Sequence, residues 1–255
     1  MPANPKLYDS ERMAYAYAFT RPPIHAHVCQ RIVAHIPPGL VIHRALDVGC
    51  GAGASTAVLS GVARHVVGVD PFPAMLRHAA SVAPDAAFSV GRAEHLPFAA
   101  TAFDLVTAAG SLNYTDIRLA LAEIARVLSR NGMFAPYDFN GGHSIAGDDR
   151  LAQRCAELRA QFPSPPGYAL NLQTLPYRAN DLDLLAYEEF DLSVPMSSAA
   201  YLQYILGDAG IETAIVGGLS ASDVRAFCEA QFSPVFADGP REVSFQVQLA
   251  IASKV

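Results

Sequence analysis

Cysteine and lysine are scarce in this 255-residue sequence, and it contains no long apolar run. The four cysteines lie far apart without a C-x-x-C pair, which argues against a metal site and predicts reduced thiols in a cytoplasmic protein. Two of the 18 basic residues are lysines and the arginines form no basic run, which argues against a nucleic-acid substrate. No stretch is apolar enough to span a bilayer, and residues 1–12 lack a signal-peptide core. We therefore expect a soluble cytoplasmic protein without a membrane partner.

Hydrophobic residues make up 51% of the chain, and the formal net charge is −6. A chain of this length and composition can bury a large core, so we expect one α/β domain over residues 1–255. The predicted segments are N-terminal helices (1–40), a core with the glycine-rich turn (41–139), an insertion (140–186) and a last segment of strands and helices (187–255).

The stretch from Arg44 to Thr56 predicts a buried strand, a tight turn and the start of a helix. Gly49, Gly51 and Gly53 supply a turn whose backbone can lie against a ligand without Cβ atoms in the way. The helix expected at 55–63 would point its free N–H groups back at this turn. Such a unit binds a nucleotide-like cofactor at the carboxyl edge of an α/β sheet.

Two carboxylates narrow the choice of cofactor. Asp47 precedes Gly49 by two positions, where a diphosphate would be repelled and a cationic cofactor favoured. Asp70 follows Gly49 by 21 positions and ends an apolar strand, near the spacing of about 20 for an acidic residue on ribose hydroxyls. The alternatives are that Asp47 caps its own turn and that Asp70 caps a helix.

Apolar periodicity predicts the remaining elements. Helices are expected at 11–19, 25–36, 118–128, 151–162, 198–206 and 221–232, and strands at 66–70, 87–90, 102–109, 133–139, 187–194 and 242–252. In the last strand, apolar residues from Val243 to Ile251 alternate with mostly polar ones, which is typical of an antiparallel strand with one face less buried.

Four sequence motifs follow one another along the chain. They are D-V-G-C-G-A-G at 47–53, D-P-F-P-A-M-L at 70–76, G-R-A-E-H-L-P-F at 91–98 and F-D-L-V at 103–106. They resemble the motifs of the class I S-adenosylmethionine (SAM)-dependent methyltransferases, in particular the small-molecule type 11 or UbiE-like domain. The resemblance implies a Rossmann-like doubly wound sheet of about seven strands with a reversed last strand. It also implies an N-terminal helical lid and a helical insertion after the fifth strand.

The same resemblance implies SAM as cofactor, S-adenosylhomocysteine as product and a small-molecule acceptor. The cofactor-binding residues carried over from it are Tyr17, Arg21, Asp47, Gly49, Gly51, Asp70, Pro71, Ala93, Glu94 and Ala109. Arg21 would meet the methionine carboxylate, or alternatively be a solvated charge. Arg92 departs from the family, which often has an acidic residue there. Because a guanidinium only donates, Arg92 cannot accept the adenine amino group, and it would stack on the ring instead.

Methyl transfer is an in-line displacement for which proximity and orientation suffice, unless the acceptor must lose a proton. Tyr114 and His143 are the acceptor-side candidates, and His25 is a third rim residue. We assign none of them as a base, and no catalytic residue is predicted. Alternatively, Tyr114 is part of the pocket wall, His143 is a loop histidine and His25 lies on the surface of its helix.

Three other functions fit parts of the pattern. An enzyme on the same scaffold, such as a cyclase or decarboxylase, would differ only in the lid. An NAD-type oxidoreductase is disfavoured by Asp47 and by the antiparallel last strand. A non-catalytic SAM-binding protein is disfavoured because both Asp47 and Asp70 are present. The sequence predicts neither the acceptor, nor the atom methylated, nor the oligomeric state.

Overall fold

The computed structural model describes residues 8–163 and 170–255. The strands are β1 (Arg44–Val48), β2 (His65–Asp70), β3 (Ala86–Val90), β4 (Phe103–Ala109), β5 (Leu128–Phe139), β6 (Ser144–Ile145), β7 (Leu182–Met196) and β8 (Arg241–Lys254). The helices are α2 (Glu11–Phe19), α3 (Ile24–Ala34), α4 (Ala54–Leu59), α5 (Pro73–Val82), α6 (Ile117–Val127), α7 (Arg150–Gln161), α8 (Ser198–Ile205), α9 (Ala209–Val216) and α10 (Ala221–Phe232). Short 3₁₀ turns lie at Leu112–Tyr114, Leu172–Thr174, Arg178–Asn180 and Ser233–Phe236.

One sheet runs in the order β3-β2-β1-β4-β5-β8-β6, and β7 pairs with β8 beside this path. The strands β1 to β5 pair in parallel, so their carboxyl ends lie along one edge. β8 is antiparallel to both β5 and β7. The predicted Rossmann-like sheet with a reversed last strand is therefore confirmed, and the two-residue β6 was not predicted.

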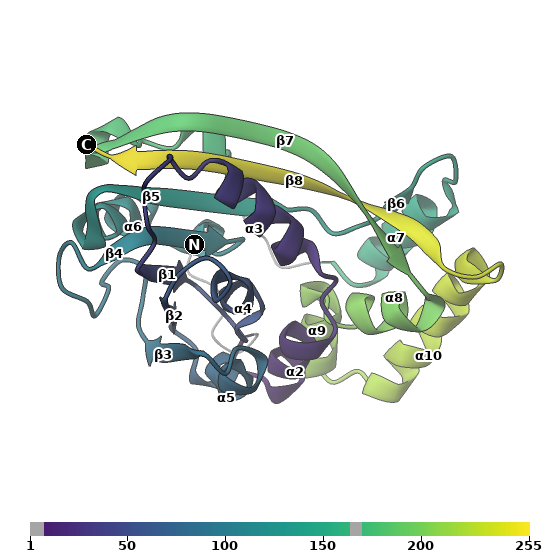
Figure 1. The fold of residues 1–255 in the computed structure, drawn as a ribbon. Coiled ribbons are helices and arrows are strands. Elements are labelled where there is room, and N and C mark those ends of the chain that lie inside the picture. The colour runs from purple at the N-terminus through teal and green to yellow at the C-terminus, as the bar shows by residue number, and fades with distance from the viewer. Residues whose placement is uncertain (1–7, 164–169) are drawn as a thin grey trace.

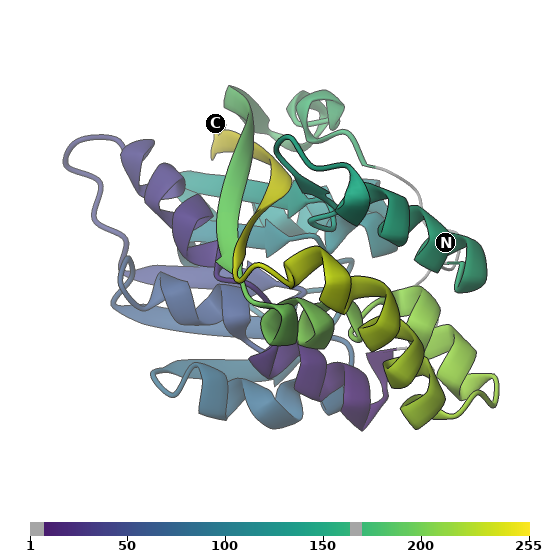
Figure 2. The same ribbon diagram turned by 90° about the vertical axis from the view of Figure 1, so that its right-hand side faces the viewer.

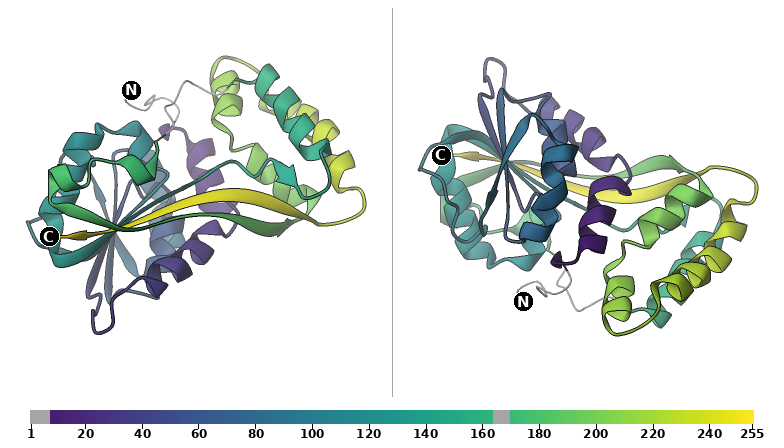
Figure 3. Two further views of the ribbon diagram at one scale, coloured as in Figure 1. Left: turned by 90° about the horizontal axis from the view of Figure 1, so that it is seen from above. Right: turned by 90° about the horizontal axis from the view of Figure 1, so that it is seen from below.

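Helices cover both faces of the parallel part (Figure 3). On one face, α3 and α4 pack through residues such as Ile32 and Leu59 against side chains of β1 and β4. On the other, α6 packs through Leu121 and Ile124. Neighbouring residues of one strand serve opposite faces, because strand side chains alternate. In β1, Ala45 belongs to the first layer and Leu46 to the second.

The long β7–β8 pair arches beyond the parallel strands, and its far half carries α7, α8 and α10 (Figure 1). Val243, Phe245 and Val247 are fully buried there, whereas Gln246 is exposed, so the predicted alternation is present. Nearer the C-terminus, Ala250 and Ala252 are buried as well, because the second layer covers that face. We call α7 to α10 the helical extension.

The N-terminal helix α2 lies between α5 and α9 (Figures 1 and 2). Ser10 caps it by accepting from the Met13 N–H at 3.1 Å, as serine does at this position. The hydroxyl of Ser10 and the guanidinium of Arg12 both donate to the carboxylate of Glu212 in α9. Since Glu212 is only 2% exposed, this contact fastens the N-terminal helix to the helical extension.

Several predicted boundaries shift. The helix after the glycine turn ends at Leu59 rather than near residue 63, because Ser60 and Gly61 are poor helix formers. β5 begins at Leu128, passing through Asn131 at a φ of 62°. β7 spans Leu182–Met196, longer than the predicted 187–194, and α9 was not predicted. Residues 1–7 of the predicted N-terminal segment and residues 164–169 of the predicted insertion lie outside the described residues. Within the described part of the chain, no helix is long and apolar enough to cross a membrane.

Candidate functional site

A cavity of about 520 Å³ lies at the carboxyl ends of β1, β2, β4 and β5. Its floor comes from the strand ends and the glycine turn, and its other walls come from α2, the start of α3 and the segment that joins α8 to α9. The predicted residues that line it are Tyr17, Arg21, Gly49, Gly51, Asp70, Pro71, Ala93, Glu94, Ala109, Tyr114 and His143. The structure thus brings together residues spread over more than 120 positions.

The glycine turn has the backbone that only glycine adopts readily. Gly49, Gly51 and Gly53 have φ values of 70°, 53° and 92°. A Cβ on Gly49 would lie 2.3 Å from the Cβ of Ser111, whereas one on Gly51 would meet nothing within 4 Å. The backbone of the turn is therefore packed against Ser111 at Gly49, whereas Gly51 faces open space.

Asp70 joins the turn to the cavity. One of its oxygens accepts from the Gly51 N–H at 2.9 Å, and the other accepts from the Phe72 N–H at 2.9 Å. The side chain is 6% exposed, and burial raises its pKa to about 6. These bonds aim a carboxylate with free lone pairs at the cavity.

Asp47 does not line the cavity, which differs from its expected contact with the cofactor. It is fully buried, and its carboxylate accepts from the hydroxyls of Ser55 at 2.6 Å, Thr56 at 2.8 Å and Thr107 at 3.0 Å. Burial raises its pKa, while the three hydroxyls oppose that rise. Asp47 thus ties β1 to α4 and β4 below the turn, and it does not cap its own turn either.

The side chain of Glu94 is already engaged. It accepts from the backbone N–H of Asp116 at 3.1 Å and from Arg92 at 3.3 Å. The Arg92 side chain is 58% exposed at the rim. Along this wall, Ala93 and Gly91 leave backbone facing the cavity, so contacts here would come from the main chain.

Arg21 stands among aromatic rings on the lid side. Its guanidinium carbon lies 3.9 Å from the ring centre of Tyr17 and 5.4 Å from that of Tyr204. No carboxylate among the described residues pairs with it. Because a guanidinium only donates, Arg21 is placed to receive an anionic group of a ligand.

Tyr114 and His143, the acceptor-side candidates, also line the cavity. Tyr114 accepts from the hydroxyl of Tyr8 at 2.9 Å, and Tyr8 stacks on Phe72 with ring centres 5.8 Å apart. His143 has its pKa lowered to about 4 by burial and by Arg159, so it is neutral at pH 7. Within the described part of the chain, its buried Nδ1 has no hydrogen-bond partner.

Sequence reasoning missed several lining residues. Tyr8, Tyr204 and Asp208 line the cavity from the lid and the helical extension, and Asp138 lines it from the end of β5. Asp138 accepts from Asn113 at 3.1 Å, and burial raises its pKa. Asp138 follows an apolar strand, as Asp70 does, and that position could have identified it. No local signal marks the other three.

The order of strands along the sheet edge determines where each lining group lies in the cavity. Asp70 follows β2, the glycine turn follows β1, Ala109 ends β4, and Asp138 is at the end of β5. Four neighbouring strands span about 14 Å at roughly 4.8 Å per step. The cavity therefore extends far enough along the sheet edge for an extended ligand. In the described residues, no group of three His, Cys, Asp or Glu side chains is placed to hold a metal ion.

Residues 46–135 match a family model described as a methyltransferase domain. This segment is a methyltransferase domain. It comprises β1 to β4, α4 to α6 and most of β5, which supply the glycine turn, Asp70 and Ala109. The resemblance seen in the motifs is therefore confirmed. The methyltransferase domain leaves out the lid helices and the helical extension.

Curated relatives match over part of the chain. The uncharacterized methyltransferase YcgJ of Bacillus subtilis is 36% identical over 102 residues, which are 38% of this chain and 40% of the relative. The demethylmenaquinone methyltransferase of Thermotoga maritima is 38% identical over 92 residues, 35% of this chain and 40% of the relative. The chain therefore matches about two fifths of the length of these relatives.

Solved structures match over more of the chain. The crystal structure of YcgJ has a TM-score of 0.54 and 25% identity, covering 89% of this chain and 98% of that one. Geranyl diphosphate C-methyltransferase from Streptomyces coelicolor, solved with S-adenosyl-L-homocysteine, has a TM-score of 0.51 and 17% identity over 90% of this chain and 77% of that one. At that identity, the second likeness shows a shared fold only.

Proposed function

We propose that this protein is a SAM-dependent methyltransferase that acts on a small-molecule acceptor. The observation that carries the proposal is the row of ligand-facing groups along the carboxyl edge of the sheet, from Asp70 past the glycine turn to Asp138. SAM would occupy the segment between Asp70 and Ala109, whose strands β2 and β4 flank β1. The part beside β5 is left for the acceptor.

The groups fit SAM one by one. The carboxylate of Asp70 has lone pairs for the two ribose hydroxyls. The open backbone at Gly51 admits the chain that links the ribose to the amino acid. Arg21, which lacks a carboxylate partner in the described residues, would pair with the methionine carboxylate. Asp47 supports this arrangement from below rather than by contact.

Methyl transfer requires the side chains mainly to position the two reactants. Bound SAM supplies an activated methyl group on a sulfonium. The walls hold the acceptor in line with the S–CH₃ bond, which converts a bimolecular step into one within a complex. The lid helices and the helical extension form walls of the cavity, which reduces the contact of a bound ligand with water. Acceptor choice would then lie in Tyr8, Tyr114, His25 and His143, outside the glycine turn.

The affinity for S-adenosylhomocysteine should fall at acidic pH. Only the ionised form of Asp70 accepts from both ribose hydroxyls, and its pKa is raised to about 6. Protonation below pH 6 therefore competes with binding, and we expect the Kd to rise about tenfold from pH 7 to pH 5. Calorimetric titration at several pH values measures this. The Asp70→Asn variant should show a flat profile, and an equally steep one would assign the effect to another group, such as Asp138.

The direct test is calorimetric titration of the purified protein with SAM, S-adenosylhomocysteine and NAD. We expect the two sulfur compounds to bind and NAD not to bind. A screen of small acceptors then follows methyl transfer as S-adenosylhomocysteine formed. Binding of NAD alone would overturn the proposal. Binding of SAM with release of products other than S-adenosylhomocysteine would favour a different chemistry on the same scaffold.

A further inference from the structure

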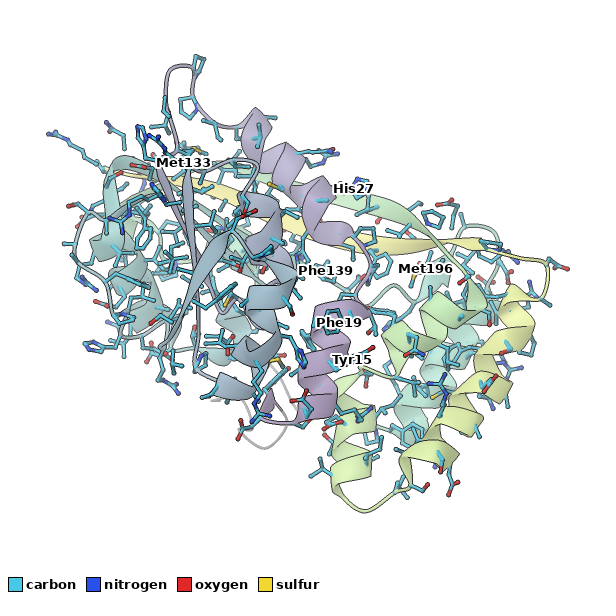
Figure 4. The ribbon with its side chains drawn as sticks, turned by 60° about the horizontal axis from the view of Figure 1, so that its bottom comes forward. Tyr15, Phe19, His27, Met133, Phe139 and Met196 are labelled. Carbon is cyan, nitrogen blue, oxygen red and sulfur yellow. The ribbon has the colours of Figure 1, made fainter. Side chains whose placement is uncertain are left out.

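His25 faces the cavity from the first turn of α3, beside the end of β5. Its ring packs edge-on against two aromatic rings, with centres 5.8 Å from that of Tyr137 and 5.7 Å from that of Phe139. Phe139, labelled in Figure 4, is the last residue of β5. Two rings from one strand therefore fix the orientation of the imidazole.

A hydrogen bond fixes its tautomer as well. The Nδ1 atom of His25 lies 2.7 Å from the hydroxyl oxygen of Tyr137, which is 3% exposed. Within the described residues, Nδ1 is the only hydrogen-bond partner of this hydroxyl. Burial raises the pKa of Tyr137 well above its ordinary value, so the phenol keeps its proton. A buried O–H without an acceptor is costly, so the phenol donates and Nδ1 accepts. A neutral ring then carries its proton on Nε2.

The imidazole is neutral at physiological pH. Burial and the nearby guanidinium of Arg21 lower the pKa of His25 to about 4. Of the other ionisable groups around this corner, Asp138 is engaged by Asn113, and the Tyr204 ring stacks on Arg21. With Nδ1 occupied, His25 has no free lone pair to take a proton. It is therefore a hydrogen-bond donor toward the cavity and cannot act as a general base.

We propose that His25 binds the acceptor through its Nε2–H, that Tyr137 positions it in this tautomer, and that the acceptor presents an oxygen anion such as a phenolate or enolate. This inference rests on the proposed function. The Nε2–H can only donate, so it favours an anionic oxygen over an ammonium group, which has no lone pair to accept a hydrogen bond.

Methyl transfer to such an anion needs no base in the site, because the acceptor has already lost its proton. The acceptor gives its proton to solvent and binds as the anion. A lone pair on its oxygen forms the bond to the methyl carbon. The S–CH₃ bond breaks and its electron pair stays on sulfur, which becomes a thioether. The negative and positive charges cancel, so no proton has to move within the cavity.

The probe is 4-nitrophenol, whose phenol and phenolate forms absorb at different wavelengths, bound to protein saturated with S-adenosylhomocysteine. In the wild type, we expect the pKa of bound 4-nitrophenol to lie about one pH unit below its value in water, which is tenfold tighter binding of the phenolate than of the phenol. His25→Phe should abolish this difference, and His25→Gln, which keeps an N–H donor, should retain part of it. Tyr137→Phe should reduce it, because Nδ1 can then carry the proton.

Tyr177→Phe is the matched control. Tyr177 is also 3% exposed and donates its hydroxyl to the Leu172 carbonyl at 2.7 Å, remote from the cavity. It should lose similar stability without changing the bound probe. The proposal fails if 4-nitrophenol does not bind, if it titrates as in water, or if His25→Phe keeps the wild-type pKa. Calorimetry with S-adenosylhomocysteine on the same samples separates the two proposals, since failure of that binding would refute the methyltransferase function itself.

Discussion

Asp70→Asn should weaken binding of S-adenosylhomocysteine about a hundredfold at pH 7. Asparagine keeps the size of the side chain and one acceptor oxygen but loses the charge and the second acceptor for the ribose. Hydrogen bonds to a charged group contribute about 1.5–3 kcal/mol each, and a loss of about 3 kcal/mol corresponds to a factor of about a hundred. Calorimetric titration of the variant and the wild type measures the difference directly.

Asp104→Asn is the control for this variant. The Asp104 carboxylate also accepts from two backbone N–H groups, those of His43 at 2.9 Å and Arg44 at 3.0 Å. These lie at the opposite end of β1 from the glycine turn, outside the cavity. We expect its affinity to equal that of the wild type. Comparable losses in both variants would mean that Asp70 acts through the stability of the fold and does not touch the cofactor.

Arg12→Leu should destabilise the protein by about 3 kcal/mol. The carboxylate of Glu212 is 2% exposed and would lose its charged partner, keeping only the hydroxyl of Ser10 at 2.5 Å. Breaking a buried ion pair on one side costs about 3–5 kcal/mol, and Arg12 is partly exposed, which places the loss at the low end. Urea unfolding at pH 7 gives the free energy of unfolding.

The double variant Arg12→Leu/Glu212→Leu should recover most of this loss, because no charge is then left buried and unpaired. Arg77→Leu is the control, because it removes a surface ion pair between the same lid helix, α2, and α5. Arg77 pairs with Glu11 on the surface, and we expect no measurable change. If the single and double Arg12 variants are equally unstable, the packing of the arginine stem, and not the charge, holds the lid.

Much of the methyltransferase domain could be predicted, because its signals act over a few residues. Ala45, Leu46 and Val48 are apolar enough for the strand to be buried on both faces, and the glycines at 49, 51 and 53 permit a backbone with positive φ. Asp70 stands out because it ends the next apolar strand. These local features identify the cofactor side of the cavity and the parallel sheet without any knowledge of long-range packing.

The tertiary structure alone decided the rest. The same motif can hold the carboxylate of Asp47 in the cavity or below it, and the hydroxyl of Thr107, from a strand 60 positions away, helps to hold it below. Tyr204 and Asp208 reach the cavity because the β7–β8 pair carries the helical extension back over the sheet edge. The tautomer of His25 depends on Tyr137, which lies 112 positions later. Local sequence therefore determined where the cofactor side lies, whereas long-range packing decided which groups face the acceptor and with which protons.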